Sequence, residues 1–91
     1  MILLLSYDLD HYQRPKAYEA VKDMVEENSI GHLKVLYSQW LIETNESPDW
    51  WSEKMKEVAD TDDDYWFIVQ VERPYQGWLP KSTWSWLRSR V

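Results

Sequence analysis

The sequence predicts an α+β sandwich, in which an antiparallel sheet carries two helices on one face and a short helical or strand extension follows. Two observations indicate this fold. Short β-prone runs alternate with amphipathic segments of helical length, and prolines stand where those segments begin. The 91 residues suffice for one compact core, so we expect a single domain over residues 1–91.

The first two elements are a strand over residues 2–7 and a helix after a polar connector. Residues 2–7 are β-prone and end in acidic residues. Pro15 suits the first helical position, because its missing N–H has no helical partner there. An apolar stripe follows at three- and four-residue spacing: Ala17, Tyr18, Val21, Met24 and Val25. The helix should end near Asn28, before the break at Gly31.

The middle of the chain predicts one long strand and a second helix. Residues 32–44 are apolar on both faces of an extended chain. One face would carry Leu36, Trp40 and Ile42, and the other Leu33, Val35, Tyr37 and Leu41. Ser47 is a typical N-cap, Pro48 a typical first helical residue, and Asp49 complements the positive end of the helix. The apolar stripe of this helix is Trp51, Met55, Val58 and Ala59.

The last third of the chain predicts a strand over 65–71 and a short helix that starts at Pro80 and presents Trp84, Leu87 and Arg88. The complete order is most of a ferredoxin-like β-α-β-β-α-β fold. Either the second and third strand positions are merged into the single long segment 32–44, or the tail supplies the last strand.

Both faces of the predicted sheet are apolar, because the runs ILLL and YWFIV lack the alternation of a sheet with one wet face. The second face therefore needs a cover. A second copy of the protein or the Trp-rich C-terminal segment could supply it, and we expect a face-to-face homodimer.

Composition narrows the classes of function. The net charge of −6 disfavours a nucleic acid partner, because phosphate contacts require basic residues. The chain has no cysteine, which removes disulfides and thiolate metal sites. The apolar start is too short for a signal peptide or a membrane span, so we expect a soluble, cytoplasmic protein with no membrane partner. Seven Trp and six Tyr suggest that some aromatic side chains lie at an interface.

Several short stretches resemble a known group of proteins. The stretches SYDL, YSQW followed by LIET, YWFIVQV, and GWLPKSTWSWL look like the small SinR-like proteins, which are similar to the CRISPR-associated protein two family and the VapD ribonucleases. The resemblance implies a ferredoxin-like homodimer with the aspartates that end the two first strands near the two-fold axis. In the CRISPR family this aspartate is tied to divalent metal and phosphodiester cleavage, and Asp8 matches it.

Two segments depart from the CRISPR family. Its helix after the YD motif is rich in Arg and Lys, whereas RPKAYEAVKDMVEEN is balanced to acidic. The segment ERPYQGWLP also differs from the usual tail, which places the strand exchange of some of those dimers in doubt.

Asp8 is the candidate for chemistry. A magnesium ion takes one or two carboxylates and keeps several waters, so one Asp8 from each of two protomers would form a minimal site. The alternative is an aspartate in the turn that leaves the strand. Asp10 and His11 could act as a second ligand or a general base, or be solvated turn residues.

Other residues have a binding or a structural interpretation. Tyr7 and Ser38 could line the same groove as Asp8, or be ordinary strand residues. Trp78 and Trp84 could stack on a ligand, or be core lids or dimer contacts. The run Asp60, Asp62, Asp63 and Asp64 lacks the Gly and bidentate Glu of an EF-hand and is expected to be a solvated connector.

Two hypotheses of function follow. The first is a homodimer without catalysis, or with weak catalysis, that presents an acidic, aromatic-rich surface to a protein partner, with host or defence factors among the candidates. The alternative is a magnesium-dependent endonuclease or endoribonuclease that uses Asp8. The net charge favours the first hypothesis, and the YD motif favours the second.

Overall fold

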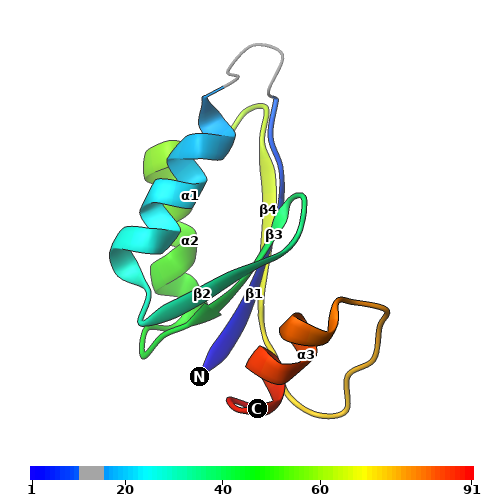
Figure 1. Cartoon of the computed structure of the whole chain (residues 1–91). Coiled ribbons are helices and arrows are strands. Elements are labelled where there is room, and N and C mark those ends of the chain that lie inside the picture. Colours follow the sequence, from blue (N-terminus) through cyan, green and yellow to red (C-terminus); the bar gives the residue numbers. More distant parts are fainter. Residues whose placement is uncertain (11–15) are drawn as a thin grey trace.

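The computed structural model describes residues 1–10 and 16–91, which form a four-stranded antiparallel sheet and three helices (Figure 1). The strands are β1 (Ile2–Asp8), β2 (Gly31–Leu36), β3 (Gln39–Glu43) and β4 (Tyr65–Gln70), and the helices are α1 (Ala17–Asn28), α2 (Pro48–Val58) and α3 (Lys81–Arg88). The sheet order is β2-β3-β1-β4. This confirms the predicted ferredoxin-like α+β fold, with a helical C-terminal extension.

The prediction of one strand over 32–44 was wrong, because the segment is the hairpin β2–β3. Tyr37 and Ser38 form its two-residue turn. Hairpin turns are usually recognised in a sequence by Asn-Gly or other Gly-containing pairs, which adopt positive φ. No described residue of this chain has positive φ. A register shift between Lys34 and Leu36 also breaks the two-face pattern, so Leu36 is exposed instead of joining the helix-covered core.

The helices begin and end close to their expected positions. The Ser47 side chain accepts a hydrogen bond from the Trp50 N–H at 3.1 Å and caps α2, with Pro48 next in the chain. The predicted helix start at Pro15 lies outside the described residues. Among the described helices, none combines the length and the apolar character needed to cross a membrane.

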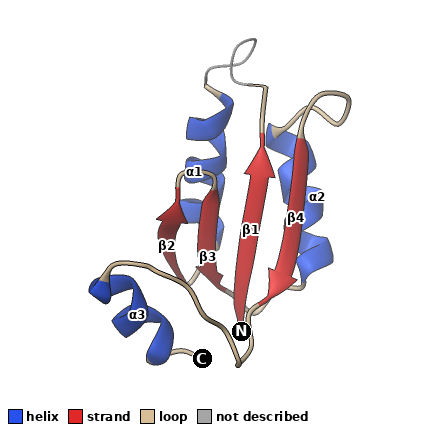
Figure 2. Cartoon of the chain, turned by 90° about the vertical axis from the view of Figure 1, so that its right-hand side faces the viewer, coloured by secondary structure: helices blue, strands red, loops and turns tan. Residues whose placement is uncertain are grey.

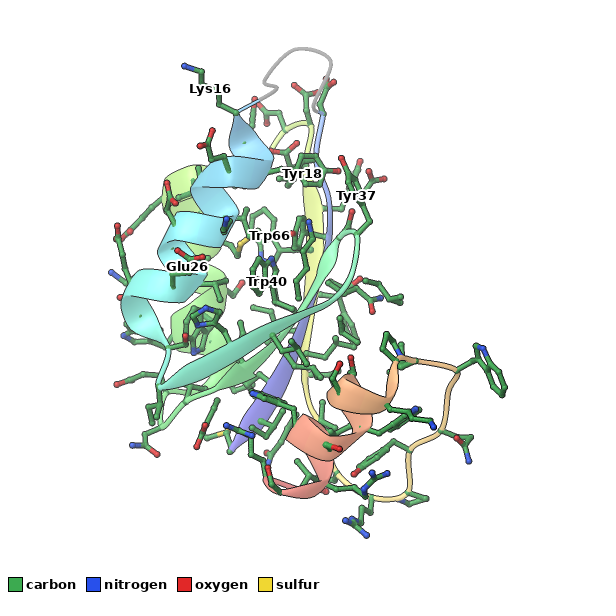
Figure 3. All side chains as sticks on the ribbon, in the orientation of Figure 1. Lys16, Tyr18, Glu26, Tyr37, Trp40 and Trp66 are labelled. Atoms are coloured by element: carbon green, nitrogen blue, oxygen red, sulfur yellow. The ribbon has the colours of Figure 1, made fainter. Side chains whose placement is uncertain are left out.

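The main core lies between the sheet and the pair α1 and α2, which cover one face together (Figure 2). Every second residue of β1 points into it: Leu3, Leu5 and Tyr7. Figure 3 shows Trp40 and Trp66 between the sheet and these helices. Trp51 is fully buried and its Nε1–H donates to Thr44 Oγ1 at 3.1 Å, whereas its neighbour Trp50 is half-buried at the edge of the core.

The second face of the sheet is partly covered by the C-terminal segment. Leu87 of α3 packs there on Ile2 and Leu41 in a separate, smaller cluster. Arg90 ties the segment to β3 through Glu43, with 3.1 Å between Arg90 Nε and Glu43 Oε1. The chain therefore covers the N-terminal half of β1 itself, and the cover expected from a second copy remains necessary only for the rest of this face.

Candidate functional site

Asp8 ends β1 on the second face of the sheet, at the end that α3 does not cover. It is exposed and pairs in register with Tyr65 of β4. A shallow cavity of about 260 Å³ adjoins it, lined by Ser6, Tyr7, Asp8, Tyr65, Trp66 and Phe67. Asp8 is the last residue of β1, so its carboxylate lies at the rim of the sheet.

Asp64 organises the acidic loop beside this rim. Its carboxylate accepts the Asp10 N–H and the Asp60 N–H, both at 2.8 Å. Asp64 is only 3% exposed, so the prediction that the whole run is a solvated connector was wrong for this residue. Asp62 and Asp63 are exposed as expected. The role of Asp64 is to hold the loop before β4 against the chain that leaves β1.

The described residues contain no group of three or more His, Cys, Asp or Glu side chains placed to hold a metal ion. Asp10 is linked to Asp64 through its backbone, and His11 lies outside the described residues. Asp8 thus offers a single carboxylate per protomer. This donor set fits a magnesium ion poorly unless a second protomer or a substrate supplies further oxygens.

Tyr7 points away from Asp8, into the core. Its hydroxyl accepts a hydrogen bond from Trp40 Nε1–H at 3.0 Å, and its ring lies 5.6 Å from that of Tyr18. Figure 3 shows Tyr18 and Tyr37 close together, and their rings are also 5.6 Å apart. Burial raises the pKa of Tyr7 above its usual 10.0, while the Trp40 hydrogen bond lowers it and the two neighbouring tyrosines raise it further.

Replacing Tyr7 by phenylalanine should lower the free energy of unfolding by about 1–2 kcal/mol at pH 7, because the buried Trp40 N–H loses its acceptor. The native pKa exceeds the unfolded one, so the stability from neutral Tyr7 is fully present below pH 10 and declines above it. Urea titrations at pH 7 and above pH 10 measure both effects. Tyr37→Phe is the control, and an equally steep alkaline loss in Tyr7→Phe would contradict the assignment.

Ser38 meets Tyr7 through the backbone, because the Tyr7 N–H donates to the Ser38 carbonyl oxygen at 3.1 Å. The two residues predicted to share a groove are therefore neighbours. Their contact is nevertheless a backbone hydrogen bond between β1 and the β2–β3 turn, and the Tyr7 ring lies on the helix-covered side.

Trp78 and Trp84 lie at the other end of the second face, away from Asp8. Trp78 is 99% exposed, whereas Trp84 is half-buried and stacks on Tyr75 with 6.2 Å between ring centroids. Both line a mostly apolar cavity of about 320 Å³ between the sheet and the segment 75–79. The predicted site residues thus divide into an acidic end and an aromatic end.

A third feature connects these ends. In the sequence its only sign is that apolar and polar residues do not alternate in the run YWFIV. Tyr65, Phe67 and Val69 of β4 project from the second face and are 72%, 68% and 40% exposed. We call these three residues the open strip. They lie on an edge strand, which makes them accessible to a partner from above and from the side.

Comparisons with known proteins bear on the fold. No protein-family model matches the sequence, and no curated protein is similar to it. A crystal structure of Cas2 from Streptococcus pyogenes at pH 6.5 is similar with a TM-score of 0.58 and 15% identity, over 80% of this chain and 88% of that chain. The comparisons give the SinR-like resemblance no support. They do show that the chain has a fold like that of Cas2.

Proposed function

We propose that this protein is a homodimer that acts by binding a protein partner, with no catalysis or weak catalysis. The observation that carries the homodimer is the open strip, where three large side chains face solvent on a sheet face that α3 covers only in part. Large exposed apolar patches are typical of interaction surfaces. The aromatic residues on it are of the types enriched at the centres of interfaces.

The charge distribution supports a protein partner over nucleic acid. The rim beside the open strip is acidic through Asp8 and the loop 60–64, and phosphates would be repelled there. The resemblance of the sequence to the CRISPR-associated protein two family implies a homodimer. The fold likeness to Cas2 is compatible with this.

Replacing Phe67 by serine should convert a dimer at micromolar concentration into a monomer, because it removes the central side chain of the open strip. Sedimentation velocity measures the change. Tyr37→Ser is a matched control, since Tyr37 is 70% exposed and contacts Tyr18 of α1 on the opposite side of the sheet. A wild-type monomer would overturn the homodimer.

The alternative function is metal-dependent cleavage of nucleic acid. Asp8 favours it, because the residue is exposed at the strand end that the family resemblance associates with divalent metal. Such a site would need Asp8 carboxylates from two protomers close together, with substrate phosphate completing the magnesium shell.

Substituting alanine for Asp8 should leave nucleic acid cleavage unchanged. With magnesium or manganese, we expect both the wild type and Asp8→Ala to cleave single- or double-stranded DNA or RNA no more than a protein-free blank. The reason is the single carboxylate that each protomer offers. Gel analysis of labelled substrates measures this. Asp63→Ala is the control for loss of one loop charge. Cleavage by the wild type that disappears in Asp8→Ala but persists in Asp63→Ala would establish the alternative.

A further inference from the structure

The second face of the sheet has the profile of a step. Residues 72–91, which we call the raised end, stand on the sheet over the N-terminal half of β1 (Figure 1). The C-terminal half of β1 and the open strip on β4 stay bare. Figure 2 shows α3 at one corner of the sheet and the upper part of β1 and β4 uncovered. The step is as high as a helix, about 10 Å.

The two levels of the step carry opposite charge. The raised end has one acid, Glu72, and four bases, Arg73, Lys81, Arg88 and Arg90, which gives +3. Residues 1–71 carry a charge of −9, which together with the +3 of the raised end gives the net charge of −6. Six of these acids gather beside the bare end: Asp8, Asp10, Asp60, Asp62, Asp63 and Asp64. Lys81 and Arg88 are exposed and form no ion pair with any described residue.

The raised end also carries the most exposed apolar side chain of those described. Trp78 is 99% exposed, on the segment between β4 and α3. A fully exposed tryptophan leaves a large apolar area in water. The open strip is the complementary surface, because its side chains are apolar, two of the three are aromatic, and all three are exposed.

These features restrict how two copies can meet. When two sheets overlap fully, their open strips cannot touch, because each raised end holds the sheets apart by about 10 Å. The part of a second copy that projects far enough to reach an open strip is its raised end. A two-fold axis makes every such contact twice, so one pairing of unlike surfaces closes the dimer.

We propose that two copies of this chain pack with the raised end of each on the open strip of the other. The arrangement rests on the homodimer proposed above. Trp78 of each copy lies on Phe67 and Tyr65 of its partner, and Lys81 and Arg88 face the acidic end. Charge complementarity selects this arrangement over the one that joins two acidic ends, because the latter brings twelve aspartates together.

The arrangement separates the two Asp8 side chains. The axis passes between the raised end and the acidic end of each protomer, so each Asp8 lies near the partner's α3 instead of near its symmetry mate. A shared magnesium site is then absent from the dimer, and the exposed carboxylate of Asp8 serves to attract the partner's cations.

Cross-linking between introduced cysteines tests the arrangement, because the sequence has no cysteine of its own. Ser82→Cys and Tyr65→Cys variants, each first shown to be dimeric by sedimentation, are mixed and treated with a short bismaleimide. We expect cross-linking in the mixture and little in either variant alone. If Tyr65→Cys weakens the dimer, Thr61→Cys marks the same end. Self-cross-linking of Tyr65→Cys or Thr61→Cys would show joined acidic ends and overturn the arrangement alone, whereas a wild-type monomer would overturn the homodimer as well.

Charge reversal provides an independent readout. Arg88→Glu should weaken self-association about tenfold at low salt, and the effect should shrink as salt is added. Lys22→Glu changes the net charge equally but lies on α1, where Lys22 is 4.0 Å from Glu26. Equal weakening by both variants would contradict the proposed contact, because it would reflect net charge alone.

Discussion

Alanine in place of Trp51 should lower the free energy of unfolding by about 4 kcal/mol, the typical loss for a buried tryptophan. Trp51 is fully buried, and its indole N–H donates to Thr44 Oγ1 at 3.1 Å. A chain of this size has a total stability of roughly 5–14 kcal/mol, so the variant should lose a large part of it. Thermal denaturation followed by circular dichroism should show a midpoint lower by at least ~15 °C.

Trp50→Ala is the matched control for this substitution. Trp50 is the adjacent residue on α2 and is half-buried, with Lys54 Nζ 5.2 Å from its ring centroid. Its loss should cost about 1 kcal/mol, because its ring covers the core without filling it. Equal losses from both variants would contradict the assignment of Trp51 as the centre of the main core.

The helices could be predicted from the sequence because their signals are local. Ser47 and Pro48 mark the start of α2, and Trp51 and Met55 recur at the spacing of one helical turn. The β2–β3 hairpin could not, because its turn at Tyr37 and Ser38 has no Gly or Asn, starts with a residue of high strand propensity and uses no positive φ.

The candidate site was predictable only in part. Asp8 could be placed at a strand end, since the apolar run of β1 stops there. The burial of Asp64 could not, because its partners Asp10 and Asp60 reach it from two different loops. Sequence spacing likewise does not distinguish Trp78, which is exposed, from Trp84, which stacks on Tyr75. Such differences depend on tertiary packing.

Aspartate in place of Leu87 should detach α3 from the sheet and leave the main core folded. Leu87 is 4% exposed and joins Ile2 and Leu41, a cluster separate from the core under α1 and α2. Placing a carboxylate there should cost about 3 kcal/mol, which corresponds to roughly 100-fold faster amide exchange in α3. Hydrogen exchange by mass spectrometry should show this loss of protection in residues 81–88, with β1 and α2 unchanged.

Ser85→Asp is the control for this substitution, because it places the same charge on an exposed position of α3. It should leave exchange within about twofold of the wild type, since surface substitutions rarely exceed 0.5 kcal/mol. Equal loss of protection in β1 would contradict the separation of the two clusters. Because the raised end is also the surface proposed to reach the partner, Leu87→Asp should in addition yield a folded monomer. A variant that lost α3 protection and remained a dimer would show that the open strip binds its partner without the raised end.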